Sequence, residues 1–427
     1  MIKNFRYLLL FLVTIFLFTA CSVKEPIVEQ VEPKISDLEF LAKTADDNVI
    51  NKEMVSKDFF EKYFKPWSAS KVSFSKIEAM WGQSYKSKKV YLENFQLATK
   101  EWFDKQIENS NFDNYNTLAN KAIILKNTNI RILPTNSPMF YDPTQPGEGY
   151  PFDYNQNSAI KINTPIIVSH LSKDRAWAYI ESGNVGGWVD IDTIAFVDKK
   201  FIQEFKNSNY FVSVKEKFPI YDPIFREYVK VATIFPKKDN QYIIAKKDDL
   251  QNAIISYINL NDDEVEAMPL IFNTQNRVKI AEQLMDEPYG WGGFLNNRDC
   301  SSFTQDYFAV FGKYLHRNSK SQISNGKYLD MSNLSNEEKK EFIKNNGVPF
   351  STLVYLKGHI MMYIGVKDNT PLVMHNMWSI RLKDETGRKY RHIVGKATIT
   401  TLEPGLDMKD YDEEHNLLKR VEGIIIL

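Results

Sequence analysis

Hydrophobic residues first gather in an almost continuous apolar run, residues 8–18, close to the start of the chain. Lys3 and Arg6 precede this run, and small residues followed by Cys21 come after it. The run is only about half of the roughly 20 residues that a membrane-spanning helix needs. The pattern therefore favours a signal peptide over residues 1–20.

The next part of the chain changes from polar to helical. Residues 21–45 are polar, contain Pro26 and Pro33, and predict a tether. From 46 to 124, apolar positions recur at helical spacing, as in the segments 57–64 and 91–103. This spacing predicts a small helical N-terminal domain whose aromatic residues form its core.

Two stretches with the character of short β-strands follow. Residues 125–200 contain short β-type runs, separated by Asn, Pro and Gly turns about every ten residues, a pattern typical of a small barrel. Residues 201–262 repeat this style. Examples of the runs are 130–133, 164–170, 187–191, 210–214 and 228–235. We expect two small β-barrels in tandem.

From 263 to 427 the pattern is mixed. Residues 275–285 predict a helix, a glycine-rich loop follows at 288–293, and an amphipathic helix opens at Cys300. Strand-like apolar runs come later. The chain as a whole is expected to be an α+β multidomain protein, because 427 residues are too many for one core.

The charge of the chain is balanced, with 54 basic against 54 acidic residues, and neither sign dominates a long stretch. A nucleic-acid binder would carry a basic face. The sequence therefore predicts no nucleic-acid partner.

Cysteine usage points to one candidate nucleophile. The chain has two cysteines, so a four-cysteine zinc site is excluded. Cys300 follows the glycine-rich loop and is flanked by Asp299 and Ser301, not by apolar residues on both sides. A thiol at a helix N-terminus meets backbone N–H groups that favour the thiolate and can bind an oxyanion.

A thiol nucleophile needs a base, and the chain offers six histidines. His359 and His375 lie in strand-like apolar runs downstream of Cys300, where consecutive strands can place them side by side. One imidazole would then act on the thiol while the other orients it. The remaining histidines are expected to be structural: His170, His316, His392 and His415.

The motifs of this region resemble, in order and spacing, those of the NlpC/p60 cell-wall cysteine peptidases. They are Tyr289-x-Trp-Gly-Gly, Asp-Cys300-Ser-Ser-Phe, Leu315-His-Arg-Asn-Ser319, Gly358-His359-Ile-x-x-Tyr-Ile-Gly and Met374-His375-Asn, spanning about 275–395. The resemblance implies a papain-like domain. One motif departs from the family, which usually has Leu-Pro-Arg where this chain has His316 before Arg317.

The resemblance also implies roles for individual residues. Cys300 would be the nucleophile, His359 the general base, His375 the orienting residue and Tyr289 part of the oxyanion site. The residues expected to bind substrate are Asp299, Ser301, Arg317, Ser319 and, from the first barrel, Glu148. Asp299 is expected to pair with a free L-alanine ammonium group.

The implied reaction is hydrolysis of the γ-D-glutamyl–diamino-acid bond of peptidoglycan stem peptides, with no metal and no cofactor. Intact stem peptides and released muropeptide fragments both remain possible substrates. Two alternatives stay open: an inactive wall-binding lipoprotein, and a papain-like amidase or acyltransferase. The first barrel resembles bacterial SH3 modules of cell-wall peptidases in the segments 131–135, 146–158, 174–179 and 187–189.

The N-terminal segment resembles a bacterial lipoprotein signal, although Phe18 stands where leucine is usual. The resemblance implies lipidation of Cys21, and Ser22 matches the outer-membrane sorting pattern. We therefore expect a monomer in the cell envelope, lipid-anchored in the outer membrane and facing the periplasm.

Overall fold

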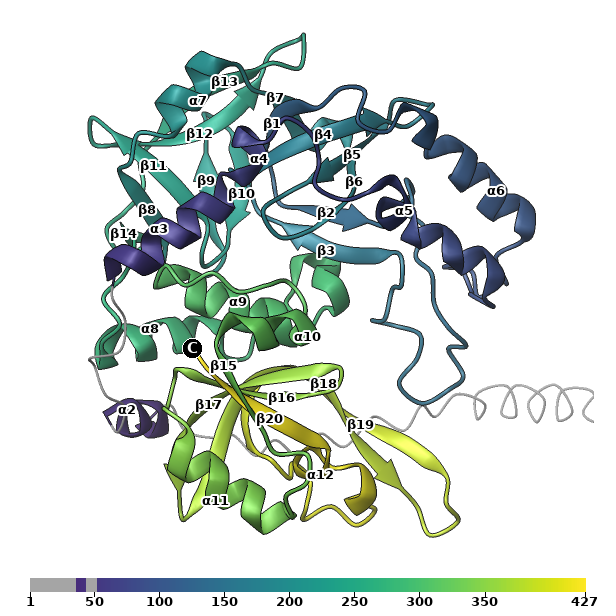
Figure 1. The fold of residues 1–427 in the computed structure, drawn as a ribbon, viewed down its shortest axis with the longest axis vertical. Helices are drawn as coiled ribbons and strands as arrows, with labels where there is room; N and C mark the ends of the chain where they lie inside the picture. Colours follow the sequence, from purple (N-terminus) through teal and green to yellow (C-terminus); the bar gives the residue numbers. More distant parts are fainter. Residues whose placement is uncertain (1–35, 44–51) are drawn as a thin grey trace, which may run out of the picture. The chain divides into compact units, whose positions relative to one another are not determined.

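The computed structural model describes residues 36–43 and 52–427 (Figure 1). The expected signal peptide, the lipidation site Cys21 and most of the expected tether lie outside these residues. Among the helices of the described part, none is long and apolar enough to cross a membrane.

One piece of the expected tether is a helix that belongs to the core. Helix α2 (Ser36–Lys43) packs against α8 (Thr274–Leu284) and β17 (His359–Lys367). Its Leu38 and Ala42 are fully buried in the largest hydrophobic cluster. The apolar residues at helical spacing in this segment were hidden among charged ones, so the prediction of a polar tether was wrong here.

The N-terminal helical region consists of short helices, some of them 3-10 turns. Their bounds are α3 (Lys52–Tyr63), α4 (Lys65–Ser68), α5 (Lys76–Ala79), η1 (Trp81–Ser87), α6 (Lys100–Asn109) and η2 (Phe112–Asn114). The helix expected over 91–103 begins only at Lys100, where the Thr99 side chain caps it. Tyr91 instead exchanges backbone hydrogen bonds with Phe140 of the first barrel, so a tertiary contact overrides the helical spacing.

The first β-module is a seven-stranded sheet in the order β3-β2-β6-β5-β4-β1-β7. Its strands are β1 (Asn120–Ile124), β2 (Thr128–Arg131), β3 (Gln156–Ile160), β4 (Pro165–Leu171), β5 (Trp177–Glu181), β6 (Gly186–Asp190) and β7 (Ile194–Phe196). Arg131 is buried and paired with the buried Asp153 at 2.6 Å, which holds the long loop between β2 and β3.

Helix α7 (Lys199–Phe205) leads into the second β-module, which has a five-stranded sheet, β13-β12-β11-β8-β14, and the hairpin β10-β9. The strands are β8 (Tyr210–Ser213), β9 (Phe218–Tyr221), β10 (Phe225–Val229), β11 (Ile234–Lys238), β12 (Gln241–Lys247), β13 (Ala253–Ile258) and β14 (Val265–Ala267). This sheet runs past residue 262, because β14 pairs with β8.

The C-terminal domain is built on a six-stranded antiparallel sheet in the order β15-β20-β16-β17-β18-β19. Its remaining strands are β15 (Lys327–Asp330), β16 (Thr352–Leu356), β18 (Thr370–Lys383), β19 (Lys389–Thr401) and β20 (Val421–Ile426). Helices α8 and α9 (Cys300–Val310) lie on one face, and α11 (Asn336–Asn346) lies on the other (Figure 1).

The alternation of side chains along β16 explains this layering. Leu353 and Tyr355 point to the cluster under α9, while Val354 and Leu356 point to the cluster under α11. Successive strand residues face opposite sides, so a strand that is apolar throughout is covered on both. The expectation of an α+β multidomain fold is confirmed.

Candidate active site

Cys300 is the first residue of α9, as the sequence pattern predicts. The Asp299 side chain accepts a hydrogen bond from the Ser302 N–H, and the Asp299 N–H donates one to the Ser302 hydroxyl oxygen. This reciprocal capping box fixes the start of the helix, and with it the position of the thiol. Cys300 is buried, with 8% of its surface exposed.

The glycine-rich loop in front of α9 docks against the first β-module. Gly292 and Gly293 both have positive φ, a region that glycine tolerates without strain. A Cβ at Gly292 would lie 2.6 Å from the Gln156 carbonyl oxygen, and one at Gly293 would lie 2.5 Å from the Ala159 nitrogen. Only glycine permits this approach, which ties the loop before the thiol to β3.

The sheet brings the two expected histidines into contact. His359 opens β17 and His375 lies in β18, and the His359 Nε2 is 2.7 Å from the His375 Nδ1. The backbone N–H of Ile360, the residue after His359, hydrogen-bonds to the Cys300 thiol. The Cys300 thiol therefore lies beside the start of β17, next to the residue that follows His359.

Hydrogen bonding beyond His375 determines which nitrogen of each histidine carries a proton. The His375 Nε2 is 3.0 Å from the Thr400 Oγ1, and this hydroxyl donates its own proton to the Thr401 carbonyl. Thr400 must then accept from His375 Nε2–H, so His375 Nδ1 accepts from His359 Nε2–H. The lone pair left free is that of His359 Nδ1, which makes this nitrogen the base.

Burial outweighs the helix N-terminus in setting the charge of the thiol. Burial, and then the negative charge of Asp299, raise the pKa of Cys300 to about 12. Burial, and then the positive charge of Arg420, lower the pKa of His359 to about 4. The pair rests as neutral thiol and neutral imidazole rather than as the thiolate that the sequence predicted, because desolvation disfavours both charged forms.

Tyr289 and His375 are also held neutral. Burial raises the pKa of Tyr289 well above its usual value, and the nearby Cys300 and Asp299 act in the same direction. Burial lowers the pKa of His375. The Tyr289 hydroxyl, which lines the same cleft as Cys300, therefore remains a hydrogen-bond donor.

Three parts of the chain match known protein families. Residues 286–393 match the NlpC/P60 family, residues 10–115 match the N-terminal NLPC_P60 stabilising domain, and residues 138–190 match an SH3 domain of the SH3b1 type. The C-terminal domain belongs to the NlpC/P60 family. The sequence-based recognition of this family, with its attached SH3 module, is confirmed.

One solved structure agrees with this assignment. The chain is similar to an NlpC/P60 endopeptidase from Photobacterium damselae subsp. piscicida, with 26% identity, a TM-score of 0.82, and coverage of 91% of this chain and 96% of that one. An NlpC/P60 family protein from Bacillus cereus ATCC 10987 is 16% identical, with a TM-score of 0.44 over 71% of this chain and 98% of that one. No curated protein matches the chain.

Asp299 of the NlpC/P60 domain is already occupied. Its carboxylate forms a salt bridge of 2.9 Å to Arg317 and also accepts hydrogen bonds from Ser301, Ser302 and Gly292. Burial opposes its ionisation, but Arg317 and Ser302 outweigh burial and hold the pKa below its usual value. The predicted pairing of Asp299 with a free ammonium therefore competes with Arg317.

The thiol opens onto a cleft of about 440 Å³ whose walls come from three domains. The NlpC/P60 domain contributes the predicted Tyr289, Asp299, Ser301, Arg317 and Ser319. The predicted Glu148 does not line the cleft itself. It accepts a hydrogen bond of 3.1 Å from Tyr154, which does.

Sequence reasoning missed the wall from the N-terminal region. Phe74, Glu78 and Trp81 line the cleft, and Phe74 and Trp81 expose 37% and 46% of their surfaces. Their aromatic spacing predicted core residues, and no local signal separates these two from the buried ones. Thr400 was missed for the same reason, because nothing in the sequence around a strand threonine indicates which side chain it hydrogen-bonds to.

The four other histidines lie apart from this arrangement. His170 is buried in β4 and hydrogen-bonds to Ser169 and to the Ser110 carbonyl, and His415 pairs with Asp412. His316 does not line the cleft, and its backbone N–H donates to Asn325, a bond that a proline could not make. His392 lies in β19, outside the cleft lining.

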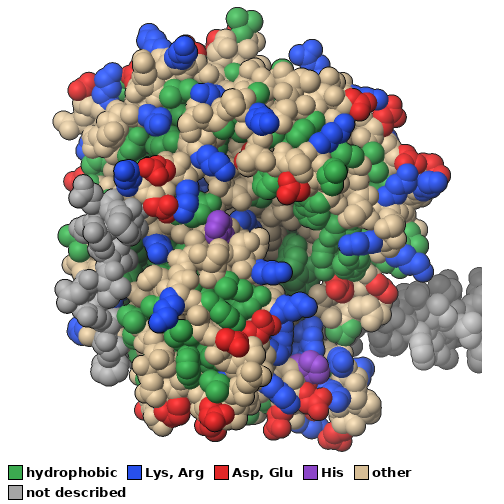
Figure 2. Space-filling model, in the orientation of Figure 1, with side chains coloured by type: hydrophobic (Ala, Val, Ile, Leu, Met, Phe, Trp, Pro, Cys, Tyr) green, Lys and Arg blue, Asp and Glu red, His purple; other side chains and the backbone are tan. Residues whose placement is uncertain are grey.

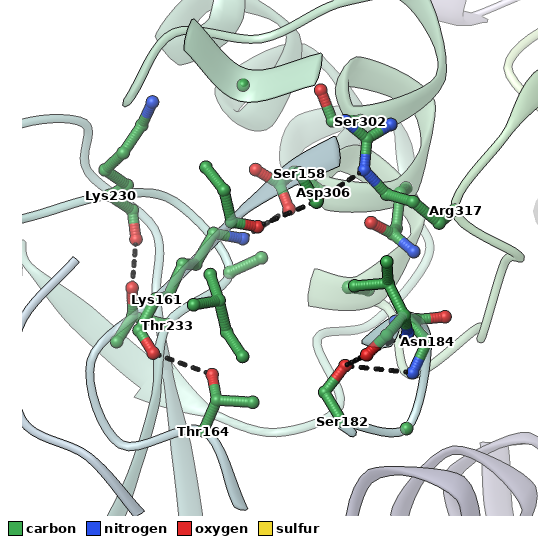
Figure 3. A pocket seen from close by; sticks show the side chains of 18 of the residues that line it. Ser158, Lys161, Thr164, Ser182, Asn184, Lys230, Thr233, Ser302, Asp306 and Arg317 are labelled. Carbon is green, nitrogen blue, oxygen red and sulfur yellow. Dashed lines mark hydrogen bonds and ion pairs between the residues drawn. The ribbon is translucent and has the colours of Figure 1, made fainter. Parts of the chain in front are cut away.

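A second cavity, of about 140 Å³, lies behind α9 where both β-modules meet the NlpC/P60 domain (Figure 3). Lys161 of the first module pairs with Asp306 of α9. Arg298 bridges Asp306 at 2.7 Å and Glu216 of the second module at 2.9 Å. At the rim, Arg317 donates to Ser158, which Figure 3 shows, so buried ion pairs hold α9 from both modules.

Within residues 36–43 and 52–427, no group of three or more His, Cys, Asp and Glu side chains is placed to hold a metal ion.

Proposed function

We propose that this chain is a cysteine peptidase that hydrolyses the γ-D-glutamyl–diamino-acid bond of peptidoglycan stem peptides. The observation that carries the proposal is the placement of the Cys300 thiol, in a cleft of an NlpC/P60 domain, beside the start of β17, where His359, His375 and Thr400 form a hydrogen-bonded series. The similar protein from Photobacterium damselae is itself described as an endopeptidase, which supports a hydrolytic role.

In the first half-reaction, His359 Nδ1 takes the thiol proton while the Cys300 sulfur attacks the γ-carbonyl carbon. A neutral pair suits this concerted transfer, because no buried charge has to be stored before substrate arrives. The backbone N–H groups at the start of α9 and the Tyr289 hydroxyl face the developing oxyanion. The protonated His359 then gives its proton to the leaving amine, which leaves a thioester on Cys300.

In the second half-reaction, water attacks the thioester carbonyl and gives its proton to His359 Nδ1. The C–S bond breaks, the glutamyl acid leaves, and the proton returns to the Cys300 sulfur. His375 keeps the imidazole of His359 oriented in both steps, since it accepts from His359 Nε2 throughout.

The setting of the reaction is part of the proposal. Lipidation at Cys21 would anchor the chain in the outer membrane, facing the periplasm, where peptidoglycan and its turnover fragments are available. We infer that the protein acts there as a monomer.

The test is digestion of L-Ala-γ-D-Glu-meso-diaminopimelate and of isolated wall fragments, followed by mass spectrometry. Wild-type protein is expected to release L-Ala-D-Glu, and Cys300→Ala to lose at least about a thousandfold of kcat, since it removes the nucleophile. The control Cys21→Ala leaves the catalytic domain untouched. A different released mass would support the amidase or acyltransferase alternative, and binding of fragments without any release would support the inactive wall-binding one.

A further inference from the structure

Three arginines converge at one end of the sheet. Arg381 and Arg391 are directly opposite each other on the antiparallel strands β18 and β19. Arg420 lies in the short helix α12 (Leu417–Arg420), before β20. Figure 2 shows Lys and Arg side chains gathered over the β18–β19 hairpin, below the central hollow of this face.

These arginines have no carboxylate partner of their own. Within the described part of the chain, none of the three forms an ion pair, and the Arg391 Nε is buried without a hydrogen-bond partner. The carboxylates of Asp412 and Glu148 act on Arg391, and that of Glu422 acts on Arg420, but only through space. Asp412 contacts His415 at 3.0 Å, and Glu148 accepts from Tyr154.

The arrangement is unfavourable for the free protein. Like charges directly opposite across a sheet are destabilising. Burial, and then repulsion from Arg381 and Arg420, lower the pKa of Arg391, and burial followed by Arg381 lowers that of Arg420. A bound anion would relieve this repulsion, and guanidinium groups match carboxylates in geometry and charge.

The cluster adjoins the side of the cleft where the leaving group must lie. Arg420 donates to the Lys357 carbonyl, two residues before His359. Trp378, three residues before Arg381 on β18, packs against Tyr289 with ring centroids 5.9 Å apart. Arg391 lies against Gly147, next to Glu148 of the first module.

Chemistry relates this side to the substrate. His359 gives its proton to the leaving amine, so the amine must approach His359 while the acyl half stays with Cys300 and the first module. The part of the substrate beyond the leaving amine then lies on the side of His359, where Arg420 contacts the Lys357 carbonyl.

We propose that Arg381, Arg391 and Arg420 form an anion-binding subsite for the free carboxylates on the leaving, diamino-acid side of the substrate. This inference rests on the proposed function, and it adds that the enzyme selects leaving groups by their negative charge. Substrates whose diamino-acid carboxylates are amidated should be poor ones.

The test compares two peptides that share the same γ-D-Glu bond, one with free and one with amidated diaminopimelate carboxylates. Wild-type protein should show about a tenfold lower KM for the free form, a usual size for charge-assisted contacts that are partly solvated. In the full-length double variant R381Q/R391Q this preference should vanish, with kcat changed by less than about twofold. The control Arg388→Gln removes an exposed arginine at the tip of the same hairpin and should keep the preference.

A binding measurement separates this inference from the proposed function. Calorimetric titration of Cys300→Ala with the diaminopimelate product, free and amidated, needs no turnover, and the affinity for the free form should fall in R381Q/R391Q but not in Arg388→Gln. If wild-type protein cleaves neither peptide, the proposed function fails while the titration still decides the subsite. If R381Q/R391Q loses affinity equally for the free and the amidated product, or for neither, the subsite is overturned. If the double variant does not fold, the single variants are used for the same comparison.

Discussion

At the scale of single residues, the hydrogen bonds of the catalytic histidines all run in one direction, from His359 through His375 to Thr400. The Thr400 hydroxyl donates a hydrogen bond of 2.7 Å to the Thr401 carbonyl, so toward His375 it can only be an acceptor. His375 therefore donates from Nε2 and accepts from His359 Nε2–H at its Nδ1, which leaves Nδ1 of His359 unprotonated. A threonine on β19 thus positions a base on β17 without touching it.

Thr400→Val should therefore lower kcat roughly tenfold with little change in KM, because a buried N–H of His375 loses its acceptor at a cost of about 1–3 kcal/mol. The proton of His375 would then move to Nδ1 in part of the molecules, which disorients His359. Steady-state kinetics on the defined tripeptide checks this. Thr400→Ser keeps the hydroxyl and should restore kcat; a Val variant as active as wild type would remove Thr400 from the mechanism.

The acid side of the pH profile follows from the pKa of His359, about 4. The base works only while unprotonated, so kcat/KM should fall as pH drops through about 4, not through the ordinary histidine value near 6.5. Arg420→Gln removes a positive charge that lowers this pKa, so the midpoint should move to higher pH. Profiles of kcat/KM, with circular dichroism at each pH to exclude unfolding, measure both midpoints. Arg388→Gln should not move the midpoint, and a wild-type midpoint near 6.5 would contradict the burial argument.

At the scale of elements, the sequence predicted those whose pattern is local. The capping residues Asp299 and Ser302 and the apolar strands around His359 and His375 each carry their signal within a few positions. The α+β class, the nucleophile helix and the pairing of the two histidine strands were therefore within reach of the sequence.

Elements whose structure depends on distant contacts were out of reach. Tyr91 pairs with Phe140 rather than continuing a helix, and α2 is a helix that packs on α8 and β17 where a polar tether was expected. The cleft wall from Phe74 and Trp81 arises because the N-terminal region packs beside the first β-module. Such contacts join segments far apart in sequence, and periodicity within one segment contains no information about them.

The docking of the glycine loop shows how an element transmits position between domains. Gly293 lies so close to Ala159 of β3 that no side chain fits, and Gln156 donates to the Gly292 carbonyl at 3.2 Å. The first β-module therefore supports the loop that leads into Cys300 and fixes its position. The sequence showed the glycines but not the surface that requires them.

At the scale of the whole chain, the ion pairs behind α9 connect both β-modules to the catalytic helix. Arg298 is 2% exposed and contacts Glu216 of the second module and Asp306 of α9, while Lys161 reaches Asp306 from the first module. Buried pairs of this kind are weak sources of net stability, but losing one partner leaves an uncompensated charge. The cluster therefore holds the modules in one arrangement around the residue that precedes Asp299 and Cys300.

Arg298→Met should consequently be among the most damaging substitutions outside the catalytic residues. It leaves Asp306 with Lys161 alone and Glu216 with only Lys230, at 3.7 Å, so the buried carboxylates lose their bridging cation, at a cost of about 3–5 kcal/mol in the free energy of unfolding. Urea unfolding followed by tryptophan fluorescence measures the loss, and Lys215→Met provides the matched control. That lysine pairs with Asp263 on the surface, with 43% and 65% of the two side chains exposed, so its loss should cost less than about 1 kcal/mol. Because Arg298 also anchors the start of α9, kcat should fall even under conditions where the variant is fully folded. If the variant unfolds at the same urea concentration as the control and keeps full activity, the modules are held in place by their apolar contacts alone.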